Sequence, residues 1–197
     1  MSPLPRCPGN QAILFCLACG STPPPPPPAP NTTTFTLSCA SPIGAITSDA
    51  TFTFVASADP VKSGGAVTYT LTPPSNGAQM LSPTFISSTS EYVVPAGLTI
   101  DSVAMQESST ADYSTLEVAL DGGEIELTEL GSFTMNSTPR PVPPFIIDAH
   151  VTAASGGTIS WMPPIDIVGE ANAGIFGTQT SSCTIENPSP LGTTQVE

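Results

Sequence analysis

Residues 116–127 read Leu-Glu-Val-Ala-Leu-Asp-Gly-Gly-Glu-Ile-Glu-Leu and carry the strongest structural signal in the chain. Apolar and polar side chains alternate on both sides of Asp121-Gly122, a dipeptide that tolerates the positive φ of a tight turn. This pattern is typical of two half-buried strands joined by such a turn. The stretch therefore predicts a β-hairpin.

The register of this hairpin depends on where the turn lies. A turn on Asp121-Gly122 would place Val118 opposite Ile125 and Leu116 opposite Leu127. It would also set Glu117 against Glu126, and like charges directly opposite each other are unfavourable. Ions or a neighbouring molecule would have to relieve that repulsion.

Similar runs continue outward from the hairpin through the rest of the chain. Each is short, alternates in polarity and is separated from the next by Gly, Pro, Asn or Asp, as in an all-β fold. We predict an antiparallel β-sandwich of about eight to ten strands, immunoglobulin-like or jelly roll. The expected strands are residues 34–40, 50–56, 66–72, 91–94, 98–106, 115–120, 124–130, 145–153, 158–162 and 177–185. The expected core residues include Phe52, Phe54, Val67, Tyr69, Leu71, Phe145, Ile147, Ala149, Val151 and Trp161.

The chain before the first expected strand has a different composition. Residues 1–22 contain Arg6, an apolar run over 12–18 and small residues at 18–20, which resemble a signal peptide and its cleavage site. Leu17-Ala18-Cys19-Gly20 is similar to a lipobox, so lipid attachment to Cys19 is an alternative. Residues 23–32 form a proline-rich linker, and its nearly all-proline part, 23–30, would span roughly 25 Å as polyproline II, at about 3.1 Å per residue. The remaining residues, 33–197, are expected to form a single domain that this linker holds off a surface.

Cysteine placement indicates an oxidising compartment. Of the five cysteines, only Cys39 and Cys183 lie in the predicted domain, one in the first expected strand and one in the last. A disulfide between them would close a loop of about 145 residues and, in the chain-entropy model, stabilise the fold by about 5 kcal/mol. Together with the leader, this predicts a secreted or cell-surface protein. Two unrelated buried thiols in a reducing cytosol are the alternative.

Charge excludes several partner classes. The chain has 16 acidic and three basic residues, giving a net charge of −13. Of the basic residues, only Lys62 and Arg140 lie in the predicted domain. Nucleic-acid binding requires Lys and Arg to neutralise phosphates, so neither DNA nor RNA is an expected partner. Adhesion to an anionic membrane surface is excluded for the same reason. A surface glycan, a protein or a second copy of the chain remain as candidate partners.

No constellation of residues indicates catalysis. The single histidine, His150, shares a strand face with Asp148, but a serine hydrolase would also need a nucleophile on a sharp turn, and the chain has no Gly-x-Ser-x-Gly element. Zinc would need three or four ligands that one histidine and two distant cysteines do not supply. We therefore expect no catalytic residues, no cofactor and no enzymatic activity.

Calcium is a weaker candidate on the acidic hairpin. Glu117, Glu124 and Glu126 are the candidate ligands, and Glu129 lies beside them. The chain has no Asp-x-Asp-x-Asp-Gly loop, and the carboxylates are expected to face solvent along the strands. Two further sites match the N-glycosylation acceptor pattern, at Asn31 and Asn136.

Three short motifs carry a resemblance to a group of proteins. They are Phe-Thr-Leu-Ser-Cys39 after the proline linker, Val-Pro-Ala-Gly97, and Ser-Cys183-Thr-Ile. In this arrangement, over residues 33–186, the chain resembles uncharacterised exported proteins of Gram-positive actinobacteria. These proteins have no assigned activity, so the resemblance implies no site residues.

Two functions remain from this reasoning. The first is a non-catalytic structural or adhesive β-sandwich module, secreted or displayed at the cell surface. The second is a carrier or binding protein for an apolar or glycan ligand. A large cavity lined by Phe52, Phe54 and Trp161 would favour the carrier, whereas a filled core with a long exposed edge strand would favour adhesion by strand addition.

Overall fold

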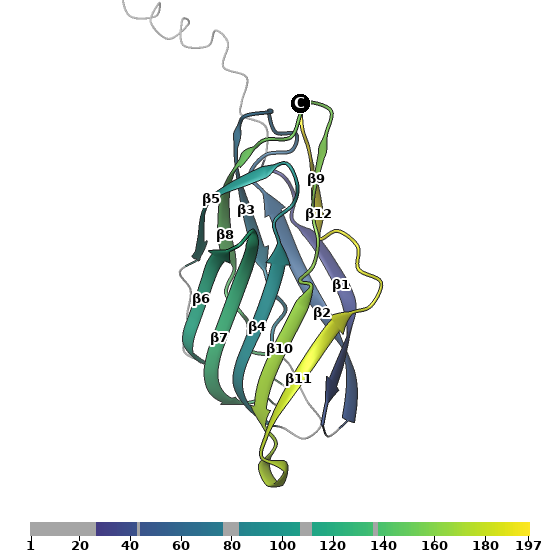
Figure 1. Ribbon diagram of the computed structural model, residues 1–197, viewed down its shortest axis with the longest axis vertical. Helices are drawn as coiled ribbons and strands as arrows, with labels where there is room; N and C mark the ends of the chain where they lie inside the picture. Colours follow the sequence, from purple (N-terminus) through teal and green to yellow (C-terminus); the bar gives the residue numbers. More distant parts are fainter. Residues whose placement is uncertain (1–26, 43, 77–82, 107–111, 136–137) are drawn as a thin grey trace, which may run out of the picture.

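The computed structural model describes residues 27–42, 44–76, 83–106, 112–135 and 138–197. These residues form twelve strands and one short 3₁₀ helix, and every strand pair is antiparallel (Figure 1). The predicted all-β, antiparallel fold is thus confirmed. The elements are β1 (Asn31–Ser41), β2 (Gly44–Ala56), β3 (Ala66–Thr72), β4 (Thr84–Val93), β5 (Leu98–Met105), β6 (Tyr113–Asp121), β7 (Glu124–Thr134), β8 (Phe145–Val151), β9 (Thr158–Trp161), β10 (Asp166–Asn172), η1 (Gly174–Phe176), β11 (Thr178–Ile185) and β12 (Gly192–Gln195).

Ten of these strands form one sheet that folds into two layers. The strand order is β5-β8-β3-β2-β1-β11-β10-β4-β7-β6, and β9 and β12 form a separate two-stranded ribbon. In Figure 1 strands β6, β7, β4, β10 and β11 form the front layer, while β5, β8 and β3 lie behind. The two edge strands, β5 and β6, come into contact without pairing, so the sheet is nearly closed.

The β1–β2 hairpin forms the corner between the layers. The two strands pair along their whole length, from Asn31 opposite Phe54 to Ser41 opposite Gly44. The last part of β2 (53–56) pairs with β3 in one layer, and the last part of β1 (37–40) pairs with β11 in the other. Strand β2 therefore joins the back layer only over its last part, and β1 joins the front layer only over its last part.

The predicted hairpin at residues 116–127 is present, but its predicted register is wrong. The turn residues are Gly122 and Gly123, both with positive φ (57° and 98°), and not Asp121-Gly122. Val118 consequently lies opposite Leu127, and Glu117 lies opposite the uncharged Thr128. The two-glycine turn separates Glu117 from Glu126 and sets Asp121 opposite Glu124 instead.

One end of the sandwich is tightly filled, and we call it the closed end. Phe54, Tyr69 and Trp161 are buried there, with ring centroids 5.5 Å apart for Phe54 and Tyr69 and 5.4 Å for Tyr69 and Trp161. The β9–β12 ribbon packs directly on these rings, because a Cβ at Gly192 of β12 would lie only 2.1 Å from the Phe54 ring. The predicted burial of Phe52, Phe54 and Trp161 is confirmed, and each such side chain contributes roughly 1.5–3 kcal/mol.

The Cys39–Cys183 disulfide joins β1 to β11. The two cysteines are cross-strand neighbours in the sheet and are 144 residues apart in sequence. The predicted pairing is therefore present in the structure. It fastens the short stretch over which β1 joins the front layer.

Candidate functional site

The other end of the sandwich, which we call the open end, contains an interior cleft of about 740 Å³. It lies between the β1–β2 hairpin on one side and strands β4, β10 and β11 on the other, with residues 73–76 at its border. The strand segments that line it lie in the lower part of Figure 1, away from the β9–β12 ribbon.

The cleft exists because small side chains occupy inward-facing positions. Ser88 and Ser90 of β4, Gly169 of β10 and Ser181 of β11 all line it. At the closed end the layers are instead separated by large rings. Removing the rings while keeping the strand spacing leaves room between the layers, since sheets pack about 10 Å apart.

The lining combines apolar and polar groups. Leu37, Phe52, Phe85 and Ile167 supply apolar walls. The serines add hydroxyl groups that can donate or accept hydrogen bonds. None of the described lining residues is basic, whereas three acidic residues line the cleft: Asp49, Glu129 and Glu170.

Glu129 is the buried acid of this cleft. It follows Ile125 and Leu127 on the inward face of β7 and is only 4% exposed. Burial raises the pKa of its carboxyl to about 7, and a hydrogen bond from Asn76 Nδ2 at 2.5 Å partly opposes that rise. The expectation that Glu129 faces solvent with the other hairpin acids is therefore wrong. Its position in the alternation could have shown this, because it shares parity with Ile125 and Leu127, not with Glu124 and Glu126.

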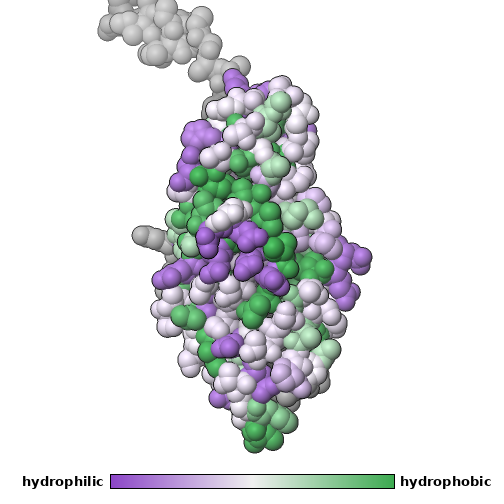
Figure 2. Space-filling view, viewed as in Figure 1, coloured by the Kyte–Doolittle hydropathy of each residue, from purple (hydrophilic) through white to green (hydrophobic). Residues whose placement is uncertain are grey.

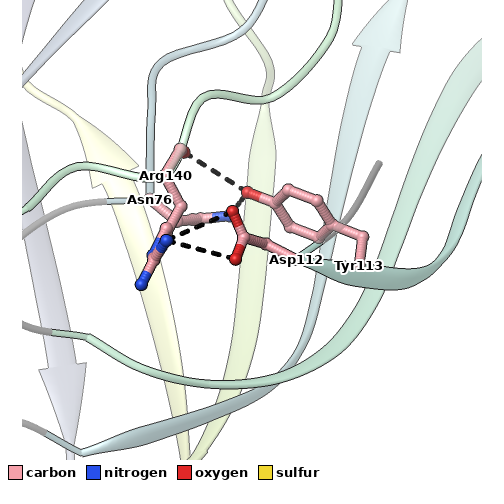
Figure 3. Close-up of polar contacts among 4 residues, drawn as sticks. All are labelled: Asn76, Asp112, Tyr113 and Arg140. Atoms are coloured by element: carbon pink, nitrogen blue, oxygen red, sulfur yellow. Dashed lines mark hydrogen bonds and ion pairs between the residues drawn. The ribbon is translucent and has the colours of Figure 1, made fainter. Parts of the chain in front are cut away.

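A polar network holds Asn76 at the cleft wall (Figure 3). Asn76 Nδ2 also donates to the Tyr113 hydroxyl at 3.0 Å, and that hydroxyl donates to the Arg140 carbonyl at 3.3 Å. The Asn76 and Arg140 backbones exchange two hydrogen bonds, and the Arg140 Nη1 lies 3.2 Å from an Asp112 carboxylate oxygen. Burial raises the pKa of Tyr113 to about 12, so its hydroxyl remains a donor at physiological pH. The network fixes the amide that in turn orients Glu129.

The structure gives His150 and Asp148 different partners. His150 Nδ1 contacts the Asp101 carboxylate, and the Asp148 carboxylate accepts hydrogen bonds from Thr68 Oγ1 at 2.7 Å and Ser102 Oγ at 3.0 Å. Neither residue lines the cleft.

The calcium candidates do not come together. Glu117 lies opposite Thr128, and Glu124 lies opposite Asp121. Glu126 has Ala119 of β6 on one side and Glu91 of β4 on the other. Within the described ranges, no group of three or more His, Cys, Asp or Glu side chains could hold a metal ion. Figure 2 shows a hydrophilic band across the middle of this face, with hydrophobic side chains on either side.

The remaining predicted positions lie near or beyond the limits of the described chain. Asn31, a glycosylation candidate, is the exposed first residue of β1, which begins two residues before the expected domain start at residue 33. Asn136 and the expected leader over 1–22 lie outside the described residues. No helix in the described part of the chain has the length and hydrophobicity to span a membrane.

Comparisons with known proteins give a weak similarity of fold alone. No protein family matches the chain, and no curated protein matches it. One solved structure, a protein of Corynebacterium diphtheriae whose description proposes a membrane anchor, is 13% identical with a TM-score of 0.42. The match covers 86% of this chain, which spans 38% of that protein. At this level of similarity it assigns neither a family nor a function.

Proposed function

We propose that this chain is an exported, non-catalytic binding module that holds its ligand in the cleft at the open end. The observation that carries the proposal is the cleft itself, an enclosed space lined by apolar walls, serine hydroxyls and one buried carboxyl. Its volume of about 740 Å³ is within the range of ligand pockets, roughly 300–1,000 Å³.

The cavity lining expected for a carrier is met only in part, because Phe52 lines the cleft whereas Phe54 and Trp161 pack in the filled closed end. The small side chains at the inward positions of the cleft favour binding over a purely structural role. A purely structural sandwich would gain stability by filling the cleft, since buried apolar area is the main stabilising term. Serine and glycine at the inward positions forgo that gain, as binding sites do.

Export and surface display belong to the same proposal. The Cys39–Cys183 disulfide supports an oxidising compartment. The proline-rich stretch from residue 23 supports display at a distance from a surface. With a net charge of −13, the preferred ligand is neutral or basic, and neither nucleic acid nor anionic lipid fits.

A filled cleft tests the proposal. A Cβ at Gly169 would meet only Ser181 Oγ at 3.5 Å and the Ser87 carbonyl at 3.6 Å, so Gly169→Leu should fold and project its side chain into the cleft. Titration with the fluorescent apolar probe N-phenyl-1-naphthylamine should show saturable binding to the parent protein, weakened at least about tenfold by Gly169→Leu. The matched control is Val168→Leu on the adjacent, outward-facing position, which should bind like the parent. Equal binding by Gly169→Leu, or no saturable binding by the parent, would contradict a cleft that binds ligand.

A further inference from the structure

Strand β2 has an unpaired edge over most of its length. Strand β1 pairs with β2 throughout, but β3 pairs only with residues 53–56. No strand in the described part of the chain pairs with the other side of Gly44–Phe52. Alternate N–H and C=O groups of that segment therefore point away from β1 without a strand to receive them. Such an edge is a template for another strand.

The sequence explains why β3 does not cover this edge. Strand β3 ends at Thr72 and is followed by Pro73 and Pro74. Proline has no N–H to donate, so the chain cannot continue the ladder along β2 at this point. The main sheet's outer strands, β5 and β6, differ from this edge because each lies against the other.

The unpaired edge borders the cleft. Residues 44–50 and Phe52 all line it, and residues 73–76 line it from the other side. A strand placed beside β2 would therefore lie at the cleft. It would be roughly 30 Å long if it matched the whole edge, at about 3.3 Å per residue. Every second side chain would point inward toward Phe52, Phe85 and Ile167, and the others would point to solvent.

We infer that the ligand of the cleft is an extended peptide segment of a partner protein, which pairs as an added strand with Gly44–Phe52 and places alternate apolar side chains in the cleft. This inference rests on the proposed function and names its ligand class. Backbone hydrogen bonds would supply affinity, and the spacing of the apolar side chains would supply specificity.

Charge favours a partner with basic or neutral residues over a second copy of this chain. The lining contains Asp49, Glu129 and Glu170 and, among its described residues, no basic side chain. A second copy also carries a net charge of −13, so two copies repel each other. Lysine at the outward positions of the added strand would instead be attracted to the exposed Asp49 and Glu170.

The test uses a nine-residue peptide with valine at every second position and lysine or threonine between them. It is compared with two N-methylated versions, one methylated at the valines and one at the intervening residues. In an antiparallel strand pair only alternate residues hydrogen bond to the neighbour, so one methylated peptide should bind like the parent peptide and the other at least about tenfold more weakly. Isothermal titration calorimetry measures all three, and Asp49→Lys should weaken binding of the unmethylated peptide.

Each outcome decides between specific alternatives. If the two methylated peptides bind equally, strand pairing is overturned. If the naphthylamine probe binds but no peptide binds at about millimolar concentration, the peptide inference fails and the proposed function stands. If neither binds, the proposed function fails as well. Sedimentation velocity could instead show a dimer that the peptide dissociates. That result would identify a second copy of this chain as the occupant and overturn the inference of a partner protein.

Discussion

The two ends of this sandwich lie between the same two layers but have different interiors. At the closed end, the rings of Phe54, Tyr69 and Trp161 fill the space between the layers. At the open end, the same layers present Ser88 and Ser90 across a cleft. Strand spacing is set by the backbone, but side-chain volume decides whether a core or a cleft results.

The comparison shows how stability and binding are divided within one domain. The closed end buries the rings of Phe54, Tyr69 and Trp161 in mutual contact, while the open end keeps an incomplete sheet edge and a buried acid. Regions that bind ligands are generally drawn from the less stable parts of a fold. Three predictions test this division, starting with the substitution that should have the largest effect.

Removing the disulfide should destabilise the domain most. Cys39 and Cys183 line the cleft and close a loop spanning 144 residues of sequence, so the Cys39→Ala, Cys183→Ala variant should lose about 5 kcal/mol in the chain-entropy model. Urea unfolding measures the loss. Amide hydrogen exchange should accelerate first in the open-end parts of β1, β2 and β11, because the bridge fastens β1 to β11 there.

A reducing agent provides the control for the disulfide. It should destabilise the parent protein to the same extent and leave the unfolding midpoint of the double variant unchanged. Uniform acceleration of exchange at both ends would contradict the division. A loss below about 1 kcal/mol would contradict the chain-entropy estimate.

Glu129 should make the stability of the open end depend on pH. Its pKa rises from an ordinary 4.5 to about 7 in the folded protein. The protonated form is therefore favoured by folding, so this contribution is fully present below pH 4.5 and is lost as the pH rises through 7. The linked free energy is about 3 kcal/mol. Glu129→Gln, which stays neutral, should match the parent near pH 4 and be more stable than the parent by up to about that amount near pH 8.

Glu126→Gln is the matched control on the same strand, because Glu126 is exposed. Its stability should follow the parent within about 0.5 kcal/mol at both pH values. Thermal unfolding across this pH range distinguishes the two variants. Parallel curves for Glu129→Gln and the parent would show that Glu129 does not titrate near pH 7 in the folded protein.

The closed end was largely predictable from sequence. Its strands alternate large apolar and polar residues, as in Val67, Tyr69 and Leu71, and period-two burial then places the rings inside. The disulfide was predictable as well, because only two cysteines lie in the domain. Both predictions rest on side chains whose burial is strongly favourable by itself.

The open end was not predictable, for a related physical reason. Strand β10 and the first parts of β2 (44–49) and β4 (84–90) were not predicted there, and at the closed end β12 was also missed. In β4 the inward positions carry Ser88 and Ser90, and in β10 one inward position is Gly169, so neither run shows the apolar alternation of a strand. Small residues at the inward positions remove the apolar alternation that would predict these strands. The same small residues create the cleft. The cleft itself depends on which strands face each other, and residue patterns alone do not determine that.

Two glycines provide the finest comparison of the two ends. At Gly192 an added Cβ would lie 2.1 Å from the Phe54 ring, so Gly192→Ala should destabilise the domain by about 1–3 kcal/mol. At Gly169 the added Cβ has ordinary contacts of 3.5 and 3.6 Å beside the cleft, and alanine in a strand interior is favoured over glycine. Gly169→Ala should therefore stabilise the domain by about 0.5 kcal/mol. Urea unfolding of both variants measures the difference. Equal effects would mean that the β9–β12 ribbon can move away from Phe54 as easily as the cleft accepts a methyl group, and the closed end would then be no more tightly packed than the open end.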